Sequence, residues 1–349
     1  MGLVQYYPAL NRPSTPVCSV CIANYNGVAL LTDCLDSVLS QKIAGNIEII
    51  VHDDASTDDS VSFLRQKYPQ VEVLVSRENV GFCIGNNRMV AHARGEYVLL
   101  LNNDAAIFPD AITVLLDAAG DQTTVGILTL PQYDWTSHKL VDRGCLLDPF
   151  YNPVPNLDPQ RGDVAMTIGA CMFLRRSLWF ELGGFPEWFE SIGEDLYLCC
   201  VARLHGVSVQ VAQASGYRHR QGVSFGGNRA GPDGLQTTVR RRRLSERNKT
   251  SVMVICTPTS LVWLLLMLHV IALFVEGATM TIARVNPRIW NGIYRPTLAH
   301  VFRDMRELLM RRKWEQSNRR ITLRAYGRNF VAMPQKLRLL RRHGIPTIR

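Results

Sequence analysis

Apolar and polar stretches alternate along the first hundred residues in a pattern that predicts strands and helices in turn. Short apolar runs rich in β-branched residues are typical of buried strands, and apolar residues three or four apart indicate helices. The expected strands are 17–23, 47–52, 71–75 and 97–101. The expected helices are 29–41, 58–67 and 86–93. This order predicts strand–helix–strand units and therefore an α/β fold with a mostly parallel sheet.

Polar residues follow three of the expected strands directly. Residues 24–27 follow the first strand, 53–58 the second and 102–104 the fourth. Because the carboxyl ends of parallel strands share one edge of a sheet, we expect the three loops to converge there. Each cluster alone is also typical of a turn or a helix N-cap, and we expect one of residues 56–58 to cap the next helix. Three clusters together favour a binding site.

The second half of the predicted domain is less regular. Five prolines interrupt residues 122–163, which predicts an irregular connection that covers the site. Order resumes at 165–175, and the second half of 183–206 is expected to be helical. Leu196, Cys199, Cys200 and Leu204 are spaced for one apolar face, and Gly206 is a natural stop. Glu194 and Asp195 then lie at a helix N-terminus, where the dipole favours acids. They are either simple first-turn acids, or one of them is a base that faces the same edge.

The composition is that of an ordered globular chain whose charge is unevenly divided. The chain has 349 residues, 47% hydrophobic and 20% charged, which allows one large domain or a domain with an appendage. Its net charge is +9, but residues 1–239 hold 16 basic and 25 acidic residues, whereas 240–349 hold 23 and 5. So basic a C-terminal part predicts attachment to nucleic acid or to an anionic membrane surface.

An uncharged run from 250 to 275 favours the membrane over nucleic acid. A helix over all 26 residues would reach about 39 Å, but Cys-Thr-Pro-Thr-Ser at 256–260 interrupts it. The strongly apolar part, 261–275, would reach about 22 Å, less than the hydrocarbon thickness of about 30 Å, and both flanks are basic. We favour a re-entrant or interfacial hairpin over a single span, with a buried helix or a dimer interface as further alternatives.

The nine cysteines show no paired framework, and we expect them to be reduced in the cytosol. The pair in Cys18-Ser-Val-Cys21 lies in an apolar strand and has no second pair to complete a zinc site, so core packing is favoured. The first 13 residues have neither a positive start nor an apolar run, so we expect no signal peptide.

Five motifs in order over residues 17–226 resemble glycosyltransferase family 2 with the GT-A fold. They are IANYNG, IEIIVHDDASTDDS, ENVGFCIGNNRMVAHARGEYVLLLNND, GGFPEWFESIGEDLYL and HRQGVSF. The chain most resembles the bacterial branch that includes rhamnosyltransferases, in which NND replaces a more acidic triplet. The resemblance implies a Rossmann-like, mostly parallel sheet that binds a nucleotide-diphospho-sugar, and an inverting transfer of the sugar.

The resemblance also implies how the donor nucleotide is held. Tyr25 would stack on the base and Asp54 would accept the imide N–H of uracil or thymine, while Asp53 beside it has a structural role. Gly81 would allow close approach of the backbone in the donor pocket. The full set of implied donor-binding residues is Tyr25, Asn26, Asp53, Asp54, Gly81, Asn87 and Asn103.

A metal site and a base are implied in the same way. Asp104 and His219 match the residues that hold Mg²⁺ or Mn²⁺ under the donor diphosphate. Asn103 supplies an oxygen without charge, which predicts modest metal affinity. Asp195 matches the general base of an inverting transfer, with Glu194 as a supporting acid, although the choice between the two stays open. Trp188 either stacks on the acceptor sugar or packs in the core.

These inferences predict an enzyme at the cytoplasmic face of a bacterial inner membrane, either peripheral, monotopic or single-span. It would move a sugar, rhamnose as first choice, from a dTDP- or UDP-sugar to a lipid-linked or cell-surface glycan. The expected divisions are a catalytic domain at 1–245, a membrane-associated helical segment at 246–283 and a basic helical tail at 284–349. A nucleotidyltransferase of related fold and a non-catalytic membrane scaffold are the alternatives, nucleic acid is a disfavoured partner, and a homo-oligomer is left open.

Overall fold

The computed structural model describes residues 4–120, 125–222, 227–231 and 234–348. An eight-stranded sheet in the order β1-β4-β3-β2-β5-β12-β7-β13 forms its centre. Its strands are β1 (Val4–Tyr7), β2 (Cys18–Asn24), β3 (Ile47–Asp53), β4 (Glu72–Ser76), β5 (Tyr97–Asn102), β7 (Val125–Thr129), β12 (Cys171–Arg175) and β13 (Ser208–Val211). The strands β2 to β5 pair in parallel, as the strand–helix alternation predicts.

Helices cover both faces of this sheet. They are α1 (Val28–Leu39), α2 (Ser60–Lys67), α3 (Phe82–His92), α4 (Ala111–Gly120), α5 (Arg176–Glu181) and α6 (Glu194–Leu204). Alternate residues of β2 enter different cores, because successive side chains of a strand point to opposite faces. Val20 belongs to the buried cluster that includes residues of α1, α2 and α4, whereas Cys21 belongs to the cluster that includes residues of α3, α5 and α6. Cys18 and Cys21 are both fully buried, which supports core packing for this pair.

Two elements differ from the expected pattern. The helix expected at 86–93 begins at Phe82, because Gly81 with φ 89° ends the preceding loop directly before it. Gly85, Asn86 and Asn87 interrupt the apolar pattern of the first turn, so the sequence does not indicate the earlier start. The stretch 122–163 was expected to be irregular, but its described part forms short strands. They include β7, β8 (Gln132–Asp134), β9 (Leu140–Asp142), β10 (Cys145–Leu147) and β11 (Pro153–Pro155).

A second, four-stranded sheet extends from the end of β5. Its order is β6-β14-β8-β9, with β6 at Ala105–Ile107 and β14 at Tyr217–His219. In the antiparallel pair β14–β6, His219 lies opposite Ala105. This register places the end of β14 beside the residue that follows β5, Asp104.

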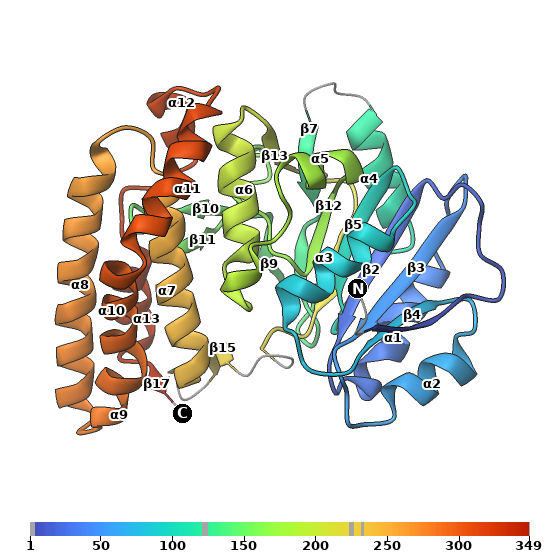
Figure 1. The fold of residues 1–349 in the computed structure, drawn as a ribbon, viewed down its shortest axis with the longest axis horizontal. Helices are drawn as coiled ribbons and strands as arrows, with labels where there is room; N and C mark the ends of the chain where they lie inside the picture. Colours follow the sequence, from blue (N-terminus) through green and yellow to red (C-terminus); the bar gives the residue numbers. More distant parts are fainter. Residues whose placement is uncertain (1–3, 121–124, 223–226, 232–233, 349) are drawn as a thin grey trace.

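The C-terminal helices pack beside the sheet, with α6 next to α7 and α8 on the outside (Figure 1). They are α7 (Val239–Cys256), α8 (Leu261–Ala283), α9 (Pro287–Ile289), η2 (Trp290–Tyr294), α10 (Arg295–Arg303), α11 (Met305–Ser317), α12 (Leu323–Gly327) and α13 (Gln335–His343). A small sheet of β15 (Gly227–Gly231), β16 (Gly234–Thr237) and β17 (Thr347–Ile348) joins the two ends of this region. Apolar residues of α6, α7, α11 and α12 belong to one buried cluster, so the helices are continuous with the core of the sheet.

The apolar run is divided between α7 and α8, and the break at 256–260 confirms the expected interruption. The helix α8 continues past the uncharged run to Ala283. Glu276, the first charged residue after that run, forms ion pairs with Arg242 and Lys336 within the protein. Within the described ranges, α8 is the one helix whose length and composition would allow it to cross a membrane, and 28% of its apolar window is buried in the protein.

Candidate active site

A network of buried polar side chains joins the ends of β2, β3 and β5. Asn24 donates from Nδ2 to Asp53 Oδ2 at 2.9 Å, and its Oδ1 accepts Asn103 Nδ2 at 2.8 Å. Asp53 also accepts the backbone N–H of Ser56 at 2.9 Å. A Cβ on Gly27 would lie 2.3 Å from Asn103 Nδ2, so this position leaves room only for glycine. The three expected loops therefore do converge, and Asp53 and Asn103 support them from below the surface.

Two residues of these loops hold the chain that follows. Asn26 Oδ1 accepts the backbone N–H of Thr57 at 2.7 Å, in a conformation with φ 49°. Asp58 accepts the backbone N–H of Ser60 at the start of α2 and that of Val28 at the start of α1. The N-cap position of α2 is Asp59, which makes no side-chain capping bond, so the cap expected within 56–58 is wrong. The Asp58 carboxylate instead accepts the first N–H of both helices. Tyr25, between these anchors, leaves 53% of its surface exposed.

Asp54 fixes the approach to α3. Its two carboxylate oxygens accept the backbone N–H groups of Val80 and Gly81 at 2.8 and 2.9 Å, and the residue is 8% exposed. A Cβ on Gly81 would lie 3.1 Å from the carbonyl oxygen of Glu190, and the φ of 89° is itself unfavourable for other residues. Further along α3, Asn87 makes a reciprocal pair of hydrogen bonds with the backbone of Phe185. These contacts bring the 185–190 segment to the same edge.

Asp104 and His219 lie in direct contact although 115 positions separate them in the chain. His219 Nε2 is 3.1 Å from Asp104 Oδ1, and His219 Nδ1 is 3.3 Å from Gln132 Oε1. Both are buried, at 3% and 8% exposed. If Gln132 accepts the Nδ1 proton, the Nε2 lone pair faces a carboxylate oxygen, and a proton or a cation must lie between them.

Sequence reasoning did not identify Gln132. It lies in the proline-interrupted stretch, and its one signal would be its place in β8, next to β14. Its Oε1 also accepts Tyr217 Oη at 2.7 Å, so its orientation is fixed on both sides. Among the described residues, no group of three or more His, Cys, Asp or Glu side chains gathers as a metal site. The chain therefore offers one carboxylate and one imidazole, a set that suits a cation completed by phosphate oxygens and water.

Glu194 and Asp195 begin α6, as predicted. Asp195 accepts the backbone N–H of Gly169 at 3.0 Å and that of Leu196 at 2.7 Å. Gly169 precedes β12, and the carbonyl of its neighbour Ala170 accepts the N–H of Asn102 at the end of β5. The carboxylate of Asp195 is thus joined through short backbone links to the strand end that precedes Asp104.

Burial raises the pKa of both acids at the start of α6. For Glu194 the neighbouring charge of Asp195 adds to this effect, and for Asp195 the hydrogen bond from Gly169 opposes it. Arg241, in the first turn of α7, is close enough to lower both pKa values. Glu194 Oε2 is buried without a hydrogen-bond partner among the residues that the structure describes. A raised pKa makes a carboxylate a stronger base.

The segment before α6 has a strained backbone. Glu190, Ile192 and Gly193 have φ values of 64°, 68° and 91°, a region that is rare for a β-branched residue such as isoleucine. Strain of this kind persists only where neighbouring groups hold it in place.

Two residues of α7 hold this strained segment. Asn248 is fully buried, and its Nδ2 donates to the carbonyls of Phe189, Ser191 and Ile192 at 3.0, 3.0 and 2.7 Å. Arg247 donates to the carbonyls of Trp188 and Phe189 and pairs with Glu190 at 3.0 Å. Sequence reasoning did not identify either residue, because they read as part of a basic run 50 residues downstream.

Aromatic residues around this segment face the C-terminal helices. The Trp188 ring packs edge-on against Phe189 with centroids 4.4 Å apart, and the guanidinium of Arg311 lies 5.2 Å from the Trp188 ring centre. Tyr197 is 7% exposed and donates to Glu315 at 3.4 Å. Trp188 therefore packs the segment before α6 against α11, and Tyr197 packs α6 itself against α11.

Comparisons with known proteins bear on the family and the fold. Residues 19–182 match the family model described as Glycosyl transferase family 2. The chain is 28% identical over 188 residues to a chondroitin synthase of Escherichia coli, with 52% of this chain and 26% of that protein aligned. It is also 28% identical over 182 residues to an N-acetylglucosaminyl-diphospho-decaprenol L-rhamnosyltransferase of Mycobacterium tuberculosis, with 44% and 59% aligned.

The chain thus spans about a quarter of the first relative's length and less than two thirds of the second's. A solved structure, GalNAc-T7 with UDP, GalNAc and Mn²⁺, superposes with a TM-score of 0.57 at 12% identity, over 85% of this chain and 58% of that chain. A likeness at this identity shows the fold, and it confirms the expected mixed α/β architecture. Residues 19–182 therefore resemble glycosyl transferase family 2, and the chain has the GT-A fold.

Proposed function

We propose that the chain is an inverting glycosyltransferase that moves a sugar from a dTDP- or UDP-sugar to a lipid-linked or cell-surface glycan. The observation that carries this proposal is the contact of Asp104 with His219 at the strand edge to which the backbone of Gly169 also joins Asp195. The names of two relatives, a chondroitin synthase and a decaprenol-linked rhamnosyltransferase, support a glycan acceptor. The second name supports rhamnose as the first choice of sugar.

The donor nucleotide would lie over the loop after β2. The exposed ring of Tyr25 is free to stack on a base, and the Asp54 carboxylate keeps lone pairs beyond those that bind Val80 and Gly81. A carboxylate accepts the imide N–H that uracil and thymine share. Asn26, Asp53, Asn87 and Asn103 would act by shaping this pocket, since each already hydrogen-bonds a neighbouring segment.

Asp104 and His219 would hold Mg²⁺ or Mn²⁺, with Gln132 fixing the imidazole. When bound, such a cation supplies Lewis-acid stabilisation of the departing nucleoside diphosphate. The presence of Mn²⁺ in the GalNAc-T7 structure supports this choice of ion.

Asp195 would act as the general base. The acceptor hydroxyl oxygen bonds to the anomeric carbon, the bond from that carbon to the diphosphate breaks, and the hydroxyl proton passes to the Asp195 carboxylate. We assign this role to Asp195 rather than Glu194 because its contact with Gly169 directs it to the strand edge. Trp188 would affect acceptor binding indirectly, because its ring packs within the segment that precedes α6.

The outer face of α8 would lie on the cytoplasmic surface of a bacterial inner membrane, in a peripheral or monotopic manner. Its large exposed side chains are apolar: Leu261, Trp263, Leu264, Met267, Leu268, Ile271, Phe274, Val275 and Ile282. Residues 284–349 beside it carry 17 basic and 3 acidic residues, which suits anionic lipids rather than a second copy of the same basic chain. The proposed divisions are unchanged: catalytic to 245, membrane-associated to 283 and basic tail beyond.

A screen of nucleotide sugars tests the donor site. We expect dTDP- or UDP-sugars with Mn²⁺ to raise the melting temperature of the full chain, and GDP-sugars to have little effect. Transfer of the stabilising sugar to a polyprenyl-diphosphate-linked acceptor is then measured directly. No stabilisation by any uridine or thymidine compound would contradict the proposed donor site, and stabilisation without transfer would favour a non-catalytic role.

A further inference from the structure

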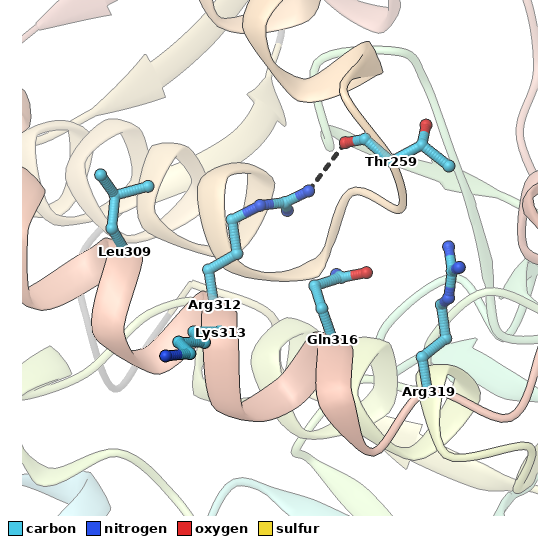
Figure 2. A pocket seen from close by; sticks show the side chains of 6 residues that line it. All are labelled: Thr259, Leu309, Arg312, Lys313, Gln316 and Arg319. Carbon is cyan, nitrogen blue, oxygen red and sulfur yellow. Dashed lines mark hydrogen bonds between the residues drawn. The ribbon is translucent and has the colours of Figure 1, made fainter.

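A pocket of about 370 Å³ lies far from the strand edge, between α11 and the turn that joins α7 to α8 (Figure 2). It is lined by Thr259, Leu309, Arg312, Lys313, Gln316 and Arg319. The helix α7 has 18 residues and therefore spans about 27 Å, and Arg241 beside Glu194 lies at its other end. The pocket is thus separate from the proposed donor and acceptor sites.

One wall of this pocket is rigid. Arg312 donates to the carbonyls of Val254, Thr257 and Thr259 at 2.8, 2.6 and 2.7 Å, which satisfies acceptors that the end of α7 leaves open. Gln316 donates to the carbonyl of Ile255 at 3.1 Å. These bonds are made by the two terminal nitrogens of Arg312 and leave its Nε–H as a further donor. The guanidinium is therefore held in place at the pocket and can still donate to a ligand.

The other cations of the pocket have no acidic partner. Lys313 and Arg319 are exposed and form no ion pair with any residue of the described ranges. No acid lines the pocket. The one acid between them in sequence, Glu315, is buried, does not line the pocket and lies 3.0 Å from His205. Three positive charges therefore surround a space that is open to a ligand.

The exposed apolar face of α8 begins close to the pocket in the chain. Thr259 lines the pocket, and Leu261 and Trp263, two and four residues later, are 37% and 50% exposed. Tryptophan next to basic residues is the combination that occurs where a protein meets lipid headgroups.

We propose that this pocket binds the phosphate of an anionic phospholipid headgroup and thereby fixes where α8 begins on the membrane surface. The inference rests on the proposed membrane association. Lysine and arginine side chains donate hydrogen bonds to phosphate oxygens, and the exposed apolar face of α8 can contact the acyl chains of a lipid. Inorganic phosphate carries a similar charge but has no acyl chains, so the apolar face of α8 favours the lipid.

Vesicle binding by the full chain tests the pocket. The variant Lys313→Gln/Arg319→Gln removes two exposed charges at the pocket, and Arg65→Gln/Lys67→Gln on α2 removes two exposed charges outside the basic tail. With phosphatidylcholine vesicles that contain phosphatidylglycerol, we expect the pocket variant to bind about thirtyfold more weakly, since each basic residue near the surface contributes about 1 kcal/mol. The α2 variant should stay within about twofold of the wild type, and circular dichroism checks that both variants are folded.

Three outcomes would overturn the inference. Equal losses for the two variants would mean diffuse attraction without a site. Stabilisation of the wild type by inorganic phosphate that the pocket variant lacks, with vesicle binding unchanged, would assign the pocket to free phosphate. Normal vesicle binding by the pocket variant, but not by Trp263→Ala/Phe274→Ala, would leave the membrane proposal standing without this pocket. If the wild type bound no vesicle, the membrane proposal itself would fall.

Discussion

The two sides of the proposed site are held by different parts of the chain. We call the residues proposed to hold nucleotide and cation the donor side: Tyr25, Asp54, Asp104 and His219. The base side is the start of α6 with the segment 188–193 before it. Loops at strand ends hold the donor side, whereas Arg247 and Asn248 of α7 hold the base side.

This difference shows that the C-terminal helices contribute to more than attachment. Asn248 reaches back 57 positions to the carbonyl of Ser191, and Arg241 at the start of α7 lies near both acids of α6. The donor side has its supports within the sheets, but the base side depends on a helix outside the residues that match the family model. The variants below are chosen to affect one side and spare the other.

The largest expected effect is on the base side. Asp195→Asn keeps the size of the side chain but removes the proton acceptor, so transfer should fall by about 10² to 10⁴-fold. The melting-temperature increase caused by donor and Mn²⁺ should remain, because the donor side is intact. Transfer within threefold of the wild type would remove Asp195 as the base.

The matching change on the donor side is Asp104→Asn. A Lewis acid at the diphosphate contributes several kcal/mol, so we expect a loss of about 10²-fold or more in transfer. In contrast with Asp195→Asn, the extra stabilisation that Mn²⁺ gives to donor binding should disappear. Asp117→Asn, an exposed carboxylate on α4, is the control and should behave as the wild type. A normal response to Mn²⁺ would separate Asp104 from the cation.

Asn248→Ala tests whether α7 positions the base. Three buried carbonyls lose their donor, which should lower the free energy of unfolding by about 1–3 kcal/mol and let the strained segment relax. We expect kcat to fall about tenfold with the KM for the donor unchanged, because the donor side does not depend on α7. A purely structural role would predict reduced stability with kcat unchanged in the molecules that remain folded.

Most of the donor side could be predicted from the sequence. Each of its loops follows a strand with a clear apolar pattern, so residues 24–27, 53–58 and 102–104 could be placed at one edge without any structure. His219 lies in no such pattern, and only its place in a family motif suggested the contact with Asp104. Gln132 could not be predicted, because the residue type and its neighbours do not indicate that β8 pairs with β14.

Less of the base side and of the helical region could be predicted. The N-terminal position of Glu194 and Asp195 follows from helix periodicity, but the positive φ values of Glu190 and Ile192 do not follow from residue type. The roles of Arg247 and Asn248 depend on packing between segments far apart in the chain. The partners of Glu276, which are Arg242 and Lys336, also depend on packing and could not be predicted from the apolar pattern.

Tyr25→Ala sharpens the donor side alone. Loss of a stacked base contributes about 1–3 kcal/mol in other complexes with nucleotides, so donor affinity should fall about tenfold. Because Tyr25 is exposed and holds no other segment, we expect stability and kcat at saturating donor to stay close to wild type. Tyr25→Phe retains the ring and is the control. Equal losses for both variants would assign the effect to the hydroxyl group instead of stacking.

The pH dependence of stability tests the base side without a measurement of transfer. Burial raises the pKa of Glu194 above the ordinary 4.5, so the folded chain binds this proton more tightly than the unfolded chain. Its contribution to stability is fully present below about pH 4.5 and is lost as the pH rises through the raised pKa, by about 1.4 kcal/mol for each unit between them. Glu194→Gln, which cannot ionise, should therefore be more stable than the wild type at neutral pH and equal to it in acid. Urea unfolding at several pH values measures the difference. The opposite result would be a wild type that gains stability relative to Glu194→Gln as the pH rises. It would show that the charge of Arg241 outweighs burial and keeps Glu194 ionised. The start of α6 would then be stabilised by an ion pair with Arg241.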